Sequence, residues 1–162
     1  GDVYKRQPFV MGHFEKRNRS ISAENVEKAY ALFQGHTYYI QKTFNESFAD
    51  TSEGEECTLE IIQAAIDNMI ASNDTIFREI LSNIPEKQKE LLYAIAKDGE
   101  AEHITSADFI KRHSLTSASS VQSAVKKLLE RDIITEINKV FSVTDRLFAM
   151  WINKLYGTVL YL

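Results

Sequence analysis

The chain has 162 residues, 44% of them hydrophobic and 26% charged, which is enough apolar material for one globular domain or two small ones. The net charge is −4, and within residues 84–156 eleven Lys and Arg face ten Asp and Glu, so no overall basic field favours nucleic acid. The single cysteine, Cys57, excludes a disulfide framework and favours a cytoplasmic location. No apolar run is long enough to span a bilayer, and the four histidines lack zinc-ligand spacing. We therefore expect neither a membrane segment nor a bound metal.

The first seven residues, GDVYKRQ, resemble the peptide produced when a sequencing adapter is translated at the end of an assembled fragment. The alternative is a natural N-terminus. The chain has no initiator Met, and it shows no signal-peptide pattern. We expect residues 1–7 to be an adapter artefact, the native sequence to begin at Pro8, and the natural protein to extend further upstream.

Residues 8–83 predict a helical unit. A short helix is expected near its start, with Phe9, Val10 and Phe14 pointing inward. The next helix begins after Ser22, a favourable N-cap residue, and ends at Gly35. Two further segments have apolar residues at helical spacing, one after Thr37 and one after a polar loop at 50–57. A last amphipathic segment precedes the boundary that we expect near Asn83.

Residues 84–157 predict a helix, a second helix, a third helix, a β-hairpin and a final helix, followed by a tail at 158–162. Thr105 and Asp108 have the spacing of a variant capping box for the second helix, and the third runs from about Ser119 to Arg131. IITEI and VFSVT alternate around the two-residue turn Asn138–Lys139, which indicates a hairpin. This order of elements is typical of a winged helix. The expected fold class is mostly α, a helical bundle followed by a winged-helix domain.

Two stretches also resemble a known family. FEKRNRSISAENVEKAYALFQGHTYYIQKTFNESF resembles the helical lid of the archaeal-type ATPases, AAA+ proteins related to origin-recognition ATPases and to STAND signalling ATPases. The lid of that group has a Gly, a small turn and an aromatic pair, matched here by Gly35 to Tyr39. SLTSASSVQSAVKKLLERDIITEINKVFSVTDRLFAMWI resembles the winged helix that follows the lid, and VTDRLFAMWI is its most distinctive part. The resemblance covers roughly residues 8–157 and implies a lid domain at 8–83.

The catalytic motifs of such an ATPase do not occur in this sequence. It contains no G-x-x-x-x-G-K-[ST] phosphate loop and no apolar strand that ends in a magnesium-binding Asp or Glu. We therefore expect this chain to be a C-terminal fragment that is not an enzyme by itself and holds no cofactor. The resemblance implies that ATP and Mg²⁺ bind a parent protein whose ATPase core lies upstream in the same chain.

Two groups of residues are candidates for binding. The resemblance implies that the lid turn, Gly35, His36, Thr37 and Tyr38, contacts the nucleotide, although a helix end followed by core aromatic residues would give the same pattern. On the third helix of the second unit, the apolar stripe leaves polar residues facing outward, and Lys139 lies in the hairpin turn. The candidate DNA-binding residues are Ser119, Ser120, Gln122, Ser123, Lys126, Lys127 and Lys139. Nearby Glu130, Asp132 and Glu136 weaken the positive field.

The resemblance therefore implies a lid and a winged helix that couple the nucleotide state of an ATPase to double-stranded DNA or to a protein partner. Two alternatives remain open at this point. One is a stand-alone winged-helix transcription regulator in which residues 8–83 form a dimerisation or effector unit. The other is an adaptor that binds proteins only.

Overall fold

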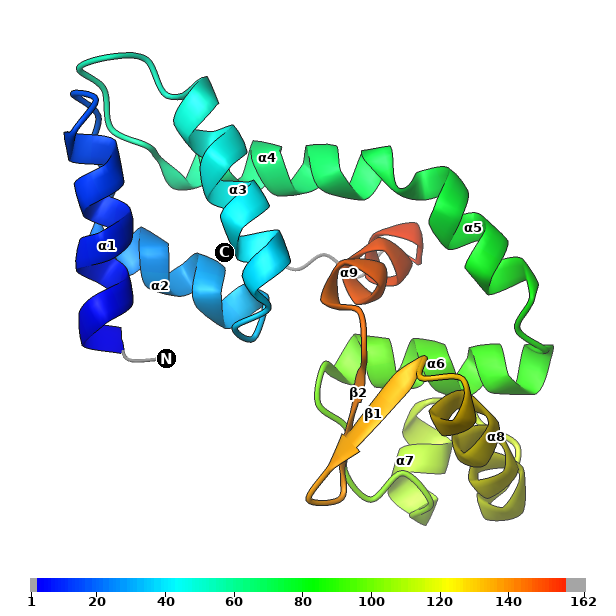
Figure 1. Cartoon of the computed structure of the whole chain (residues 1–162). Helices are drawn as coiled ribbons and strands as arrows, with labels where there is room; N and C mark the ends of the chain where they lie inside the picture. The colour runs from blue at the N-terminus through cyan, green and yellow to red at the C-terminus, as the bar shows by residue number, and fades with distance from the viewer. Residues whose placement is uncertain (1–2, 157–162) are drawn as a thin grey trace. The chain divides into compact units, whose positions relative to one another are not determined.

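The computed structural model describes residues 3–156, and the chain divides after Ser72 into two compact units (Figure 1). Gly1 and Asp2 of the expected adapter segment, Gly157 and the expected tail at 158–162 lie outside the described residues. The first unit is a bundle of helices. Its described elements are α1 (Val3–Glu15), α2 (Ala23–Leu32), α3 (Thr37–Asp50) and α4 (Leu59–Ser72).

The first unit is held by aromatic and aliphatic side chains that are fully buried, among them Phe14, Phe33 and Ile66. α1 packs on α2, and α3 packs on α4. Ser22 caps α2 as predicted, since its hydroxyl accepts a hydrogen bond of 3.1 Å from the Asn25 amide. Phe9 differs from the prediction because it is 67% exposed, while Val10 and Phe14 point inward. Phe9 lies about 100° around the helix from Val10, so the two cannot share one narrow buried face.

The second unit has the element order of a winged helix. Its described elements are α5 (Asp74–Ser82), α6 (Glu86–Asp98), α7 (Ala107–Arg112), α8 (Ala118–Glu130), β1 (Ile134–Ile137), β2 (Val140–Val143) and α9 (Arg146–Leu155). β1 and β2 pair in antiparallel register from Ile134 with Val143 to Ile137 with Val140. On the other side of β2, Ala101 forms a bridge with Phe141. The predicted fold class, mostly helical with a winged helix, is confirmed.

The wing closes at the turn that the sequence predicted. Asn138 and Lys139 have φ angles of 51° and 65°, the left-handed conformation that a two-residue type I′ hairpin turn requires at both positions. Helix starts differ slightly from the prediction. Ser106, not Thr105, caps α7 through a 3.1 Å hydrogen bond from the Phe109 amide, and α8 begins at Ala118 because Ser117 accepts from the Ser120 amide.

The boundary between the units falls after Ser72, earlier than the sequence pattern placed it, because α5 packs against α9. The ring of Phe77 lies 5.1 Å from that of Phe148 and 5.8 Å from that of Trp151, measured between centroids. Trp151 Nε1 also donates a 2.9 Å hydrogen bond to Asp74 Oδ1. These contacts join the start of α5 to the last helix, and they assign α5 to the winged-helix unit.

Arg146, the first residue of α9, is buried to an unusual degree for arginine. It is only 8% exposed, and its Nε and Nη1 atoms have no hydrogen-bond partner among the described residues. Burial lowers the pKa of its guanidinium, and the charge of Glu100 acts in the opposite direction. A buried cation without full hydrogen bonding costs folding free energy.

Candidate functional site

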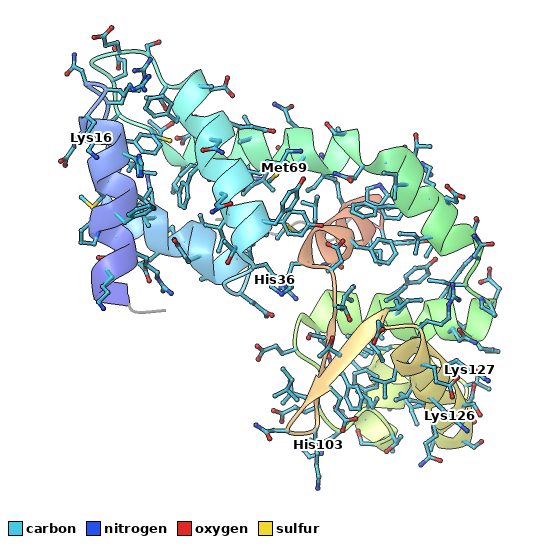
Figure 2. The ribbon with its side chains drawn as sticks, viewed as in Figure 1. Lys16, His36, Met69, His103, Lys126 and Lys127 are labelled. Carbon is cyan, nitrogen blue, oxygen red and sulfur yellow. The ribbon has the colours of Figure 1, made fainter. Side chains whose placement is uncertain are left out.

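α8 presents one apolar and one polar face, and the polar face contains most of the predicted DNA-binding residues. Val121, Ala124 and Leu128 are buried on the inner face. The outward side chains are exposed for Ser119, Gln122, Ser123, Lys126 and Lys127, and half-buried for Ser120. Figure 2 shows Lys126 and Lys127 projecting from α8 away from the body of the winged helix. The predicted surface is therefore accessible along the whole helix.

The N-terminus of α8 has additional polar groups that the sequence analysis did not select. Lys87 on α6 donates a 2.8 Å hydrogen bond from Nζ to Thr116 Oγ1, and Ser117 Oγ lies 3.2 Å from Ser119 Oγ. This brings an ammonium group and several hydroxyls to the end of α8 where backbone N–H groups also point outward. Lys87 lies about 30 residues before α8 in the chain, so only the packing of α6 against α8 reveals its proximity.

A groove of about 570 Å³ lies between α8 and the wing. Two predicted residues, Gln122 of α8 and Lys139 of the hairpin turn, line it, so the structure brings these separate segments together. Ile104, Val125 and Phe141 also line it, together with His103, Thr105 and Asn138, and its carboxylates come from Glu102 and Glu136. His103 is exposed beside the wing (Figure 2).

The charge around α8 and the wing is mixed rather than strongly positive. Lys127 Nζ lies 3.7 Å from a carboxylate oxygen of Glu130, in an exposed pair of the kind that contributes little to stability. Within the groove, Glu102 and Glu136 oppose the single ammonium group of Lys139. The face can thus contact phosphates with a few lysines, but it has no continuous basic stripe.

The predicted nucleotide-contacting residues form one exposed turn between α2 and α3. Gln34 and Gly35 have φ angles of 49° and 78°, and the Gly35 N–H bonds to the Tyr30 carbonyl at 3.1 Å, so α2 ends in a Schellman motif with Gln34 at the left-handed C′ position. His36 and Thr37 are exposed, and Tyr38 is 67% exposed with its ring 5.4 Å from that of Tyr39. Figure 2 shows His36 at the outer edge of this turn.

The N-terminus of α3, which follows directly, has features that favour an anion. His36 occupies the N-cap position without a side-chain capping hydrogen bond, and the first turn of α3 contains no acidic residue. At the start of α3, the Ile40 N–H donates a 3.2 Å hydrogen bond to the His36 carbonyl, which lies four residues earlier. The positive end of the helix dipole is thus uncompensated by a capping side chain and open to solvent.

Other functional chemistry has little support in the part of the chain that the structure describes. No three His, Cys, Asp or Glu side chains between residues 3 and 156 gather as metal ligands. Cys57 is fully buried, and burial raises the pKa of its thiol, so it does not form a reactive thiolate readily. Among the described helices, none combines the length and the apolar character that crossing a membrane requires.

Comparison with known proteins agrees with the element order of the second unit. Residues 75–154 match the model of a family described as a probable winged helix domain. A search of curated protein sequences finds no match. Among solved structures, the chain is similar to the Walker-type ATPase PABY2304 of Pyrococcus abyssi, with a TM-score of 0.66 and 14% identity, over 94% of this chain. The chain spans only 42% of the length of that ATPase.

Proposed function

We propose that this chain is the lid and winged-helix region of an ATP-dependent protein, and that its winged helix binds double-stranded DNA through α8 and the wing. The observation that carries the proposal is the convergence of Gln122 on α8 and Lys139 on the wing at one groove, beside the exposed lysines of α8. In winged helices and related helix-turn-helix folds, the helix in this position enters the major groove while adjacent elements contact the backbone.

The similarity to a Walker-type ATPase supports the link to nucleotide, since that fold match includes nearly all of this chain. In this proposal ATP and Mg²⁺ bind the upstream core, and the turn from Gly35 to Tyr38 meets the nucleotide. The N-terminus of α3 supports this role because it has no side-chain cap and because the positive end of a helix dipole attracts phosphate groups. The nucleotide state then changes the position of the lid and, through it, the availability of the winged helix.

DNA binding is tested by the fluorescence anisotropy of a labelled duplex, titrated with the chain at salt concentrations from about 50 to 200 mM. If Lys126, Lys127 and Lys139 each neutralise one phosphate, log K falls against log salt with a slope of about −2.7. Replacing all three by Ala removes most of this slope, whereas Lys97→Ala, at an exposed lysine of α6, leaves it unchanged. Equal binding by the triple variant and the parent would contradict the proposed surface.

The ATPase link is tested at the source locus. A continuous reading frame upstream of the Pro8 codon that encodes a phosphate loop supports the proposal. A start codon immediately before Pro8 without such a motif contradicts it, and leaves the winged-helix transcription regulator as the better explanation.

A protein partner is a second candidate, favoured by a specific observation at the wing. Ile137 is 66% exposed beside the turn, and Glu102 and Glu136 line the groove, a combination that opposes a phosphate backbone but suits a polypeptide. The same anisotropy experiment separates the two candidates, because a protein-docking wing shows no duplex binding even at the lowest salt concentration.

A further inference from the structure

A second groove, of about 680 Å³, lies in the first unit between α1 and α3. In Figure 1 the two helices run side by side and in the same direction, α1 resting on α2 and α3 on α4. The wall from α1 includes Phe9, His13 and Arg17, and the wall from α3 includes Ile40, Phe44 and Phe48. Because each helix packs mainly on another partner, the space between them is only partly filled.

The residues that line the groove extend over several helical turns on both walls. Its lining extends from Phe9 to Arg17 along one wall and from Thr37 to Phe48 along the other, about 12 Å and 16 Å at the helical rise per residue. On both walls the lining residues recur every three or four positions, as on a surface that receives a neighbouring helix. These dimensions fit two to three turns of an α-helix and exceed those of a single nucleotide base.

The inner surface of the groove is aromatic and open at its mouth. The rings of Phe14 and Phe48 meet edge to face with centroids 5.3 Å apart and join the two walls. Phe9 is 67% exposed, and the centroid of its ring lies 4.8 Å from that of the His13 ring. An exposed phenylalanine beside an aromatic groove provides apolar surface of the kind that an amphipathic helix covers in a helix-in-groove interface.

The charge of the groove selects the chemistry of its occupant. Among the described lining residues, Arg17 and His13 are basic, and no lining residue carries a carboxylate. The end of the groove at Arg17 is thus cationic and favours a carboxylate.

We propose that this groove binds an amphipathic helix of a partner protein, with apolar side chains against Phe9, Phe44 and Phe48 and an Asp or Glu paired with Arg17. This interaction is separate from the winged helix and does not depend on its binding DNA. Helix-in-groove recognition of this kind reads apolar anchors at i, i+3 or i+4 and i+7.

The test selects binders from a displayed library of random peptides of about 14 residues, a length that spans the groove as a helix, against the full chain. The expected winners carry apolar residues at helical spacing and at least one acidic residue. A synthetic winner then binds about tenfold more weakly, or worse, to Arg17→Glu and to Phe9→Ser. Both positions are exposed, so the variants should remain folded, which circular dichroism checks.

Matched controls are Lys16→Glu, a charge reversal at the neighbouring exposed cation outside the groove lining, and Ile76→Ser, an exposed apolar residue of α5. Both should bind the peptide like the parent chain. The proposal is overturned if selection yields no peptide sensitive to Phe9 and Arg17, or if winners carry Lys or Arg in place of the acid. It is also overturned if the chain is a dimer that Phe9→Ser converts to a monomer, because the groove is then a self-interface.

Discussion

The two sides of the winged-helix unit differ in how they use their side chains. Where α5 meets α9, the contact is aromatic and largely buried, with Phe77 3% and Trp151 4% exposed. Along α8 the outward side chains are polar and mostly exposed, and the wing adds the exposed side chains of Ile137 and Lys139. A closely packed contact contributes stability and tolerates little change. An exposed polar face contributes little stability, so its residues can be selected for what they bind.

The largest effect is expected at the aromatic contact between α5 and α9. Phe77→Ala should lower the free energy of unfolding of the second unit by about 3–5 kcal/mol, because it leaves a cavity beside Phe148 and Trp151. Trp151 is the only tryptophan of the chain, so urea unfolding followed by its fluorescence reports this unit. Ile76→Ala, at the adjacent exposed position, should change stability by less than about 0.5 kcal/mol. Similar losses of unfolding free energy in both variants would show that the buried aromatic contact contributes no more than an exposed residue.

The second prediction concerns the buried guanidinium at the start of α9. Arg146→Met should raise the free energy of unfolding by about 1–4 kcal/mol, because it replaces a charge that lacks full hydrogen bonding by an apolar side chain of similar length. Arg146→Lys keeps the buried charge and should give no such gain. The urea midpoints of the parent chain and the two variants measure the change in stability. A loss of stability in Arg146→Met would show that the guanidinium of Arg146 makes a net stabilising interaction.

A smaller, pH-dependent effect is expected where α7 meets α6. Arg112 Nη1 donates a 2.9 Å hydrogen bond to Asp98 Oδ1, and His113 Nε2 lies 3.1 Å from the same oxygen. Burial by itself would raise the pKa of the Asp98 carboxyl, but Arg112 and His113 together lower it below its ordinary value.

Because the pKa of Asp98 is lower in the folded state, its contribution is complete above the unfolded value of about 4 and is lost as the pH falls through the folded value. Asp98→Asn should therefore cost about 1 kcal/mol at neutral pH, and the difference from the parent should shrink on acidification below about pH 4. Urea titrations across this range measure it. A pH-independent difference would mean that the ionised carboxylate does not hold α7 against α6.

The smallest stability effect is expected on the α8 face. Lys126→Ala and Lys127→Ala should each change the free energy of unfolding by less than about 0.5 kcal/mol, since both side chains are exposed and the Lys127–Glu130 pair is solvated. Each should nevertheless reduce the salt slope of duplex binding by about 1. Thermal melts and anisotropy on the same samples compare the two properties. A large loss of stability would show that the face is structural.

Local sequence signals predicted the features that depend on local physics. The alternation around Asn138–Lys139 predicted the hairpin, and the spacing of Val121, Ala124 and Leu128 predicted the inner face of α8. The hydroxyl at Ser22 predicted the start of α2. Each of these depends on residues within one or two turns of chain.

Features that depend on distant residues were not predictable in this way. α5 belongs to the second unit because Asp74 bonds Trp151, 77 positions later in the chain. Nothing near Arg146 in the sequence indicates that it is buried, and the groove that Phe9 lines between α1 and α3 could not be placed without tertiary structure. The exposure of the candidate residues on α8 followed from the helical pattern, whereas their convergence with Lys139 required the fold.

The buried thiol of Cys57 provides a separate probe of local opening in the first unit. Its thiol is fully enclosed, and the segment that carries it is tied to Ser20 through a 2.7 Å hydrogen bond from the Cys57 amide to the Ser20 carbonyl. A thiol reagent can therefore modify the chain only when this segment opens, and the rate of labelling reports the opening frequency. With Trp151 in the second unit, these 162 residues contain one cysteine and one tryptophan as reporters, so the cooperativity between the units can be measured without adding a probe to either.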